Sequence, residues 1–319
     1  MALPEKEVIG ILSDNLKIRN SVLPISKKSA TRWAKDLNIS PGGETVLYTG
    51  MMYQIIPYIT ALVNALEKME GSFLMKFITL GRYTNRFINI SNFFGKVDKK
   101  EIKKHNHTLK TIARLLQKSG TEFGYLYDND LYVGALAYDL GADDVLNKHI
   151  RKVHEKLKAN NVKKVITVDP HTTNMLRDII PQRIEGFDIE VKSYMEVLAE
   201  KGIQPVNQLE DEVVIHDSCI YARHEGMVDE PRSLLNNAGI KTTCPEDDCG
   251  KFTFCCGGPV ESLYPDKAMD IGKQRLEQLH KAGNKIAVMC PVCYANLTRS
   301  NSNGLQIHDI VDLLEATYL

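Results

Sequence analysis

The first 218 residues contain no cysteine, although the chain of 319 residues has seven. A secreted protein stabilised by disulfides would spread its cysteines along the chain and would usually be much smaller. Here all seven lie between residues 219 and 293 and include an adjacent pair and a CxxC motif. Such a clustered set indicates metal or redox chemistry rather than a disulfide framework.

Long apolar runs and an excess of charge are also missing. No apolar run approaches the ~20 residues that a membrane-spanning helix requires. Residues 1–20 include Glu5, Glu7 and Asp14, where a signal peptide would have an apolar core. Forty basic and forty acidic residues give a formal net charge of zero, so the composition implies no general attraction to nucleic acid. We therefore expect a cytoplasmic protein that does not bind nucleic acid.

Short apolar segments alternate with amphipathic segments of helical period. The segments of strand type are 45–49, 122–127, 162–168, 212–215, 251–254 and 285–289. The segments of helical type are 60–66, 142–160, 231–237 and 266–281. This alternation predicts an α/β fold built from parallel βαβ units, in which the loops at the carboxyl ends of the strands carry the chemistry.

Four motifs occur twice, in the same order, in the two halves of the chain. The aligned pairs are YTGMMY (48–53) with HDSCIY (216–221), LYVGALAYDLG (131–141) with FCCGGPVESLY (254–264), VDPHTTNML (168–176) with MCPVCYANL (289–297), and VKSYMEVL (191–198) with IHDIVDLL (307–314). The repeat predicts two pseudo-twofold-related domains that face each other, each a small parallel sheet with flanking helices. The predicted boundaries are an extension over 1–43, a first domain over 44–205 with an insertion at about 71–110, and a second domain over 206–319.

The repeat places five residues of the first half opposite cysteines of the second half. These residues are Met51, Tyr132, Val133, Asp169 and Thr172. Such a set cannot hold an iron–sulfur cluster, which needs thiolates. The first pocket is therefore predicted to be vacant or to have another use, and Asp169 with His171 could bind a metal or relay protons there.

The second half presents its five aligned cysteines in three groups, each of which closes or follows a predicted strand, so that three loops can converge. The cysteines are Cys219, Cys255, Cys256, Cys290 and Cys293. Five thiolates exceed the four that a zinc ion or an ordinary cubane cluster needs. An adjacent pair also cannot easily place both sulfurs on one tetrahedral ion. An extended iron–sulfur cluster is favoured, and a zinc site with a spare thiol is the alternative.

The series HDSC…YARHEG…PRSLL…CCGG…CPVCYANL resembles the cysteine-rich CCG domain of the heterodisulfide reductase components HdrB and HdrD, over about residues 44–316. The resemblance implies that the five cysteines hold one noncubane 4Fe–4S cluster. Family members carry two such domains, and disulfide cleavage in them is understood to use two clusters, whereas this chain keeps one motif. Its CCGGPVES loop also departs from the glycine run common in the family.

The resemblance also implies partners, because the chain lacks the CxxCxxCxxxCP run of a ferredoxin. Electrons would come from a ferredoxin-like subunit of the HdrC type and from a flavoprotein, either of the HdrA type or an electron-transfer flavoprotein. The expected function is that of a redox subunit which exchanges electrons with a thiol, a disulfide or a sulfur carrier. The alternatives are a pure electron-transfer subunit of a flavoprotein dehydrogenase or quinone-linked complex, and a zinc-stabilised scaffold.

Polar residues beside Cys219 are further candidates for the site. His216, Arg223 and His224 could donate hydrogen bonds to cluster sulfides or to a bound thiolate, or they could have surface or capping roles. Cys244 and Cys249 lie close in sequence to the cluster loop. They are predicted to be ordinary thiols or, as the alternative, to take part in redox or sulfur chemistry.

The predicted insertion of the first half has a composition of its own. Residues 71–96 contain phenylalanine, lysine and arginine but no acidic residue. This composition fits a lid over the first pocket, a surface that binds a partner, or peripheral contact with an anionic membrane. The lysine-rich helix expected over 99–117 is predicted to be a solvated face.

Overall fold

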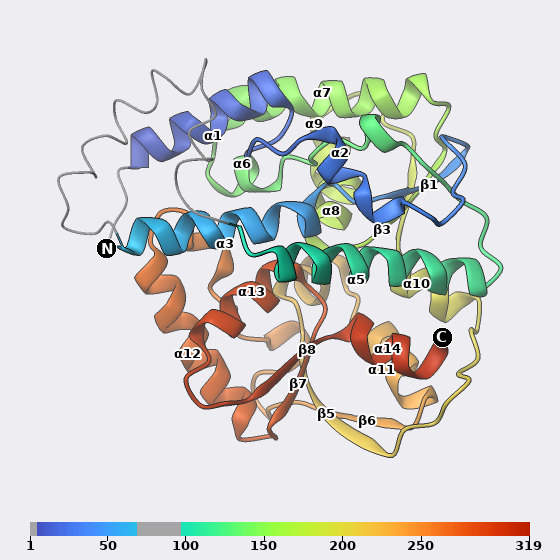
Figure 1. Cartoon of the computed structure of the whole chain (residues 1–319), viewed down its shortest axis with the longest axis vertical. Coiled ribbons are helices and arrows are strands. Elements are labelled where there is room, and N and C mark those ends of the chain that lie inside the picture. Colours follow the sequence, from blue (N-terminus) through green and yellow to red (C-terminus); the bar gives the residue numbers. More distant parts are fainter. Residues whose placement is uncertain (1–4, 69–96) are drawn as a thin grey trace.

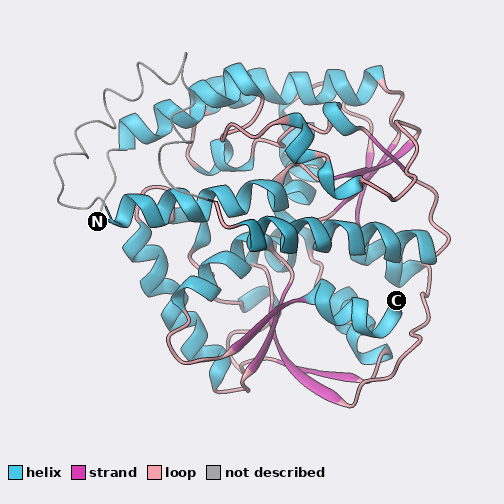
Figure 2. Cartoon of the chain, in the orientation of Figure 1, coloured by secondary structure: helices cyan, strands magenta, loops and turns pink. Residues whose placement is uncertain are grey.

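The structure is a computed structural model that describes residues 5–68 and 97–319. In this part of the chain the strands form two sheets, each of four parallel strands (Figures 1 and 2). The strand orders are β2-β1-β3-β4 and β6-β5-β7-β8, so both sheets follow one order. The predicted architecture of two small parallel sheets with flanking helices is confirmed. The strands are Thr45–Tyr48 (β1), Gly124–Tyr125 (β2), Lys164–Thr167 (β3), Glu190–Ser193 (β4), Asp211–His216 (β5), Ile240–Thr243 (β6), Lys285–Val288 (β7) and Gln306–Asp309 (β8).

Helices connect the strands and cover both faces of each sheet. In the first half they are Glu5–Arg19 (α1), Lys27–Ala30 (α2), Met52–Lys68 (α3), Lys99–Lys118 (α5), Ala135–Asp139 (α6), Asp143–Ala159 (α7), Pro170–Asn174 (α8), Ile180–Arg183 (α9) and Tyr194–Glu200 (α10). In the second half they are Asp229–Asn237 (α11), Pro265–His280 (α12), Pro291–Ser300 (α13) and Ile310–Tyr318 (α14). Short 3₁₀ or π turns lie at Arg32–Ala34 (η1), Tyr127–Asn129 (η4), Met175–Ile179 (η5), Ile220–Glu225 (η6), Gly250–Phe252 (η7) and Gly258–Val260 (η8).

The pleat of the strands divides the apolar side chains between separate cores. Successive side chains of a strand point to opposite faces, so Val46 of β1 packs with α7 in one core while Leu47 packs with α5 in another. The second sheet behaves alike, because Val214 of β5 joins the core around the site cysteines and Ile215 joins the core that contains Leu47. One core therefore contains strand residues from both sheets.

Helix α5 runs through the middle of the molecule, between the two halves of the chain (Figure 1). It contacts α3, α10 and α14. Its apolar side is buried in the core shared by the two sheets and consists of Leu109, Ile112, Ala113, Leu115 and Leu116. The expectation of a solvated helix is therefore wrong, because only the lysine-rich side of α5 faces solvent.

Two further expectations about elements need correction. Residues 251–254 do not form a strand, because 250–252 make the turn η7 and the place beside β5 is taken by β6 at Ile240–Thr243. Helix α3 begins at Met52 and includes Pro57, whereas the helix was expected only after this proline. The other predicted elements lie within a few residues of their expected bounds.

The aromatic and basic stretch at 71–96 lies outside the described residues, so the lid, partner and membrane interpretations stay predictions, as do the domain boundaries and the pseudo-twofold relation. Among the helices described, none combines the length and the apolar character that crossing a membrane would take.

Candidate metal centre

Three loops at one edge of the second sheet carry the five aligned cysteines. Cys219 follows β5 and begins η6, and Cys290 follows the neighbouring strand β7 and caps α13. Cys255 and Cys256 lie between η7 and η8, and Cys293 is in the first turn of α13. Because the carboxyl ends of neighbouring parallel strands meet at one sheet edge, these positions are brought together. All five are free thiols.

The five thiols form a continuous row of side-chain contacts. Side-chain hydrogen bonds join Cys219 to Cys255, Cys255 to Cys256, Cys256 to Cys293, and Cys293 to Cys290. Cys256, Cys290 and Cys293 are buried, while Cys219 and Cys255 are partly exposed. The predicted convergence of the three loops is therefore present in the structure, and the open end of the row is at Cys219 and Cys255.

The contacts divide the thiols into proton donors and acceptors. A hydrogen bond from Cys219 lowers the pKa of Cys255, and the same bond raises the pKa of Cys219. Burial acts to raise the pKa of Cys290, but hydrogen bonds from Cys293 and His171 outweigh it and lower this pKa well below the usual value. The site therefore stabilises the thiolates of Cys255 and Cys290, and a thiolate is the form of cysteine that binds a metal.

The loop that carries the adjacent pair is tightly built around its sulfurs. The backbone N–H groups of Gly257 and Gly258 donate to the sulfurs of Cys255 and Cys256, each at 3.3 Å. A side chain at Gly258 would place its Cβ 2.4 Å from Val292, and Gly257 has a φ of +85°, in the left-handed region that glycine favours. Glycine is thus required here for the close approach of backbone N–H groups to sulfur.

His216 lies beside the row, with a ring nitrogen within 4.8 Å of the sulfurs of Cys256 and Cys293. Its Nδ1 accepts a hydrogen bond of 3.1 Å from Nε of Arg275. Burial, together with the charge of Arg275, lowers the pKa of His216 to about 3, so the ring is neutral and its proton is on Nε2. The buried Nε2 has no hydrogen-bond partner in the described structure. We therefore identify His216 as a donor toward sulfur rather than a metal ligand.

The donor set fits an iron–sulfur cluster better than a zinc ion. A structural zinc site takes four ligands, whereas this row presents five thiols together with N–H donors directed at sulfur. N–H groups near thiolates and sulfides are how proteins tune iron–sulfur clusters. The buried, unpartnered Nε2 of His216 is a further donor of this kind.

The other two polar candidates beside Cys219 are exposed at the surface. Arg223 is exposed, and its guanidinium donates to the backbone carbonyl of Thr253, two residues before Cys255. His224 is exposed at the end of η6. Arg223 therefore holds the loop of the adjacent cysteine pair from outside.

The five aligned residues of the first half are buried, and three of them belong to an apolar core. Met51, Tyr132 and Val133 pack in the core around α7, while Asp169 and Thr172 are fully buried. Asp169 is the N-cap residue of α8 and accepts from the backbone N–H of Thr172, and Cys290 occupies the N-cap position of α13; a proline follows in both helices. These five side chains are thus packed inside the first half of the chain.

His171 reaches from the first half to the row of thiols. Its ring is hydrogen-bonded to the sulfur of Cys290 and lies near the carboxylate of Asp139 and the fully buried carboxylate of Asp169. Burial acts to lower the pKa of His171, but the contact with Cys290 and the two carboxylates outweighs it and raises the pKa to about 9. The sequence indicated His171 only as half of a weak Asp-x-His pair; its contact with Cys290 depends on how the halves pack.

Cys244 and Cys249 are joined by a disulfide, with Cα atoms 5.7 Å apart. This finding corrects the interpretation of the two residues as ordinary thiols.

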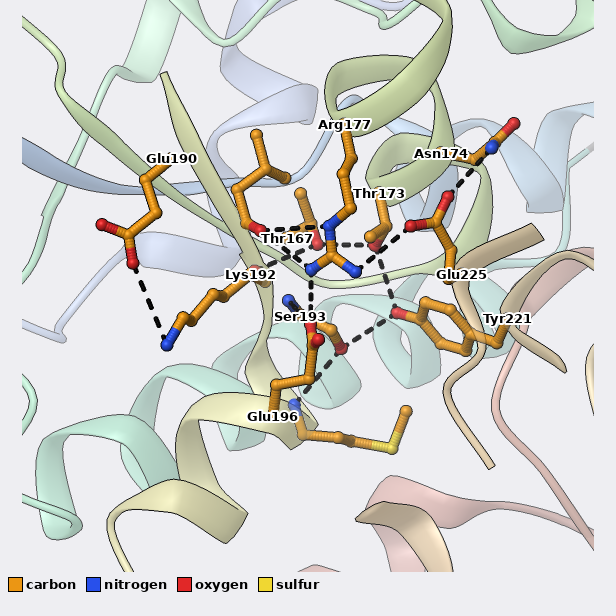
Figure 3. A network of polar contacts seen from close by, with 12 residues as sticks. Thr167, Thr173, Asn174, Arg177, Glu190, Lys192, Ser193, Glu196, Tyr221 and Glu225 are labelled. Carbon is orange, nitrogen blue, oxygen red and sulfur yellow. Dashed lines mark hydrogen bonds and ion pairs between the residues drawn. The ribbon is translucent and has the colours of Figure 1, made fainter. Parts of the chain in front are cut away.

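A network of polar contacts fixes η6, which begins at Cys219, to the first half of the chain (Figure 3). Arg177 donates to Glu225 at 3.1 Å and to Glu196 at 2.6 Å, and Asn174 donates to Glu225 at 2.9 Å. The side chain of Glu225 is only 2% exposed, so these partners supply the hydrogen bonds that water would give at the surface.

Replacing Arg177 with methionine is expected to lower the free energy of unfolding by about 3 kcal/mol, because Glu225 would keep a buried charge without its cation. The double variant Arg177→Met, Glu225→Met should be less destabilised than the single variant. Urea unfolding followed by the fluorescence of Trp33, the only tryptophan, measures both. A double variant that is destabilised by the sum of the two single effects would contradict the coupling.

Comparison with known proteins places this site in a family. The family model of the cysteine-rich domain called CCG matches residues 213–298. The chain carries a CCG domain. The matched range contains β5 to α13, and with them all five cysteines of the row.

The similarity to curated proteins covers more of this chain than the match to the CCG domain does. The chain is 35% identical to the EtfAB:quinone oxidoreductase of Syntrophomonas wolfei, over 57% of this chain and 27% of that protein. It is 27% identical to the probable iron–sulfur-binding oxidoreductase FadF of Bacillus subtilis, over 66% of this chain and 31% of that protein. It is also 27% identical to the HdrD polypeptide of the dihydromethanophenazine:CoB–CoM heterodisulfide reductase of Methanosarcina mazei, over 63% of this chain and 53% of that protein. The matches thus cover between about a quarter and about half of each relative.

Proposed function

We propose that this chain is an electron-transfer subunit of an iron–sulfur oxidoreductase, and that its five converging cysteines hold one noncubane 4Fe–4S cluster. The observation that carries the proposal is the continuous row of five free thiols within the CCG domain. Relatives named as iron–sulfur oxidoreductases and as parts of heterodisulfide reductases support the class of reaction.

Each residue around the row has a defined task in this proposal. When bound, the cluster supplies one-electron redox chemistry and an iron site for a substrate sulfur. Cys219 and Cys255, at the exposed end of the row, lie where a thiol, disulfide or sulfur carrier approaches. His216 donates from Nε2 toward sulfur, and His171 donates to Cys290 from the opposite half. These donors stabilise negative charge on sulfur and so favour the reduced state.

The electron partners are proposed to be separate subunits, a ferredoxin-like protein of the HdrC type and a flavoprotein of the HdrA or electron-transfer flavoprotein type. Names of relatives that include EtfAB and heterodisulfide reductase are consistent with such complexes. Phe252 is 82% exposed, three residues before Cys255, and Phe254 and Val260 are exposed around it. This apolar rim suits contact with a partner that delivers electrons to the row.

Purification under anaerobic conditions, followed by iron, sulfide and zinc analysis, tests this proposal. We expect about four irons and a similar amount of sulfide per chain. The EPR spectrum of the oxidised protein should change when a substrate-like thiol is added, because the thiol would bind at an iron. Iron with an unchanged spectrum would favour a pure electron conduit. Zinc without iron would overturn the redox function in favour of a scaffold.

A further inference from the structure

A second pair of cysteines lies outside the row of five thiols. Cys244 and Cys249 are bonded to each other across the loop between β6 and η7, and both are partly exposed. Glu246 and Asp247, between them, are exposed. The bond is therefore within reach of a thiol from solution, unlike the buried sulfurs of Cys256, Cys290 and Cys293.

The disulfide contributes little to the stability of the loop. Cross-links stabilise a protein mainly by closing long loops, and this one joins residues only five apart. Hydrogen bonds already hold the loop at its Cys249 end, because Asp217 accepts from the backbone N–H of Gly250 at 2.8 Å and Arg275 donates to the carbonyl of Asp248 at 3.1 Å. A purely structural role for the disulfide is accordingly small.

A cation lies against one of the two sulfurs. Nη2 of Arg232 is 3.4 Å from the sulfur of Cys249 and forms a paired salt bridge with Asp217, with N···O distances of 2.7 and 2.8 Å. The carboxylate is further from this sulfur, at 3.9 Å. A nearby cation stabilises a thiolate, so Cys249 is the better leaving group when the bond opens. An incoming thiolate is then directed to Cys244.

We propose that Cys244 and Cys249 form a reversible thiol–disulfide exchange site beside the row of five cysteines, which takes thiols as reductant and disulfides as oxidant. A thiolate RS⁻ attacks Cys244, the Cys244–Cys249 bond breaks, and Cys249 leaves as a thiolate. A second thiolate then attacks the sulfur of the RS group in the mixed disulfide, the bond between that sulfur and Cys244 breaks, RSSR forms, and Cys244 leaves as a thiolate. The two protons lost by the two RSH molecules go to the two cysteines, so the protein gains two electrons and two protons.

Buried contacts connect this pair to the row. Arg275, which is fully buried, donates to the carbonyl of Asp248 inside the loop, to Nδ1 of His216 and to the hydroxyl of Thr253. Arg275 therefore connects the disulfide loop directly to His216, which lies beside Cys256 and Cys293. The exchange chemistry itself does not rest on the metal content of the row, so either proposal can fail alone.

Redox titration of the full-length protein with bound metal tests the site. The protein is equilibrated anaerobically with mixtures of reduced and oxidised dithiothreitol, alkylated, and examined by peptide mass spectrometry. We expect Cys244 and Cys249 to become alkylated together in one reversible two-electron transition. With oxidised glutathione and rapid quenching, the trapped adduct should lie on Cys244. A pair that opens only in denaturant, or that does not re-form with oxidised dithiothreitol, would overturn the proposal.

Substitution of Arg232 tests the direction of attack. Arg232→Gln is expected to slow opening of the bond by glutathione about tenfold, because the leaving thiolate loses its cation. Arg232→Lys retains the charge and should restore most of the rate, which a purely structural role of the side chain would not require. A thioredoxin-type dithiol protein in place of glutathione shows whether small or protein thiols react faster. Equal rates for Arg232→Gln and the unaltered protein would exclude the assigned leaving group.

Discussion

The Cys256→Ser variant is expected to lose nearly all of its iron and sulfide, from about four irons per chain. Cys256 is the central member of the row, in contact with both Cys255 and Cys293, and is only 2% exposed. Serine has almost the same shape, so the fold should persist. Its hydroxyl does not ionise as a thiol does and would not replace the thiolate ligand.

The matched control is Cys249→Ser, which removes a cysteine of the same CCG domain outside the row. This variant should keep the iron content and the visible absorption of the unaltered protein. Zinc analysis of Cys256→Ser also separates an iron–sulfur cluster from a zinc site, because the four remaining thiolates would still bind a zinc ion. Full retention of iron in Cys256→Ser would show that this cysteine is not a ligand.

The free energy of unfolding should fall by about 3 kcal/mol between pH 4 and pH 7 because of Asp130 alone. This carboxyl is buried, and burial raises its pKa from 3.8 to about 7, although N–H and hydroxyl donors of Thr49 and Gly50 counteract the shift. The folded protein therefore keeps a proton that the unfolded chain releases above pH 3.8. The stability from this group is complete below that pH, declines as the pH rises, and is lost above about pH 7.

Asp130→Asn isolates this contribution, because an amide oxygen can accept from the N–H groups of Thr49 and Gly50 as Oδ1 does now. The stability of the variant relative to the unaltered protein should rise by about 4 kcal/mol from pH 4 to pH 8. The control, Asp128→Asn, changes an exposed carboxylate and should alter stability by under ~1 kcal/mol at either pH. Urea unfolding at several pH values measures both, and parallel pH curves for Asp130→Asn and the unaltered protein would contradict the assignment.

Sequence patterns predicted the central strands, whose side chains are buried, and they failed at the sheet edge, where most side chains of a strand are partly exposed. The central strands β1, β3, β5 and β7 are apolar runs and were predicted closely. β6 was missed because only its first residue, Ile240, is buried, and the remainder is a partly exposed Lys-Thr-Thr at the sheet edge. The strand expected at 251–254 fails because Thr253 uses its hydroxyl to bond the carbonyl of Asp217 and to accept from Arg275.

The site shows the same limit. The spacing of the cysteines and the repeat together predicted which thiols converge, since those depend on local strand–loop–helix units. Arg275 could not be anticipated, because an arginine in an amphipathic helix normally indicates a solvent-facing position. The contact between His171 and Cys290 joins residues more than a hundred positions apart, and only the packing of the two halves creates it.

The core that contains residues of both sheets limits how the gene can be divided. Leu47 and Ile166 pack in the same apolar core as Ile215 and Ala287, with α5 between the halves. A fragment that begins after residue 205 would leave its side of that core facing water. The cysteine-bearing half is therefore not a portable module. Fusions, truncations or transplanted cluster domains based on this chain should keep both halves, even though one half alone carries every thiol.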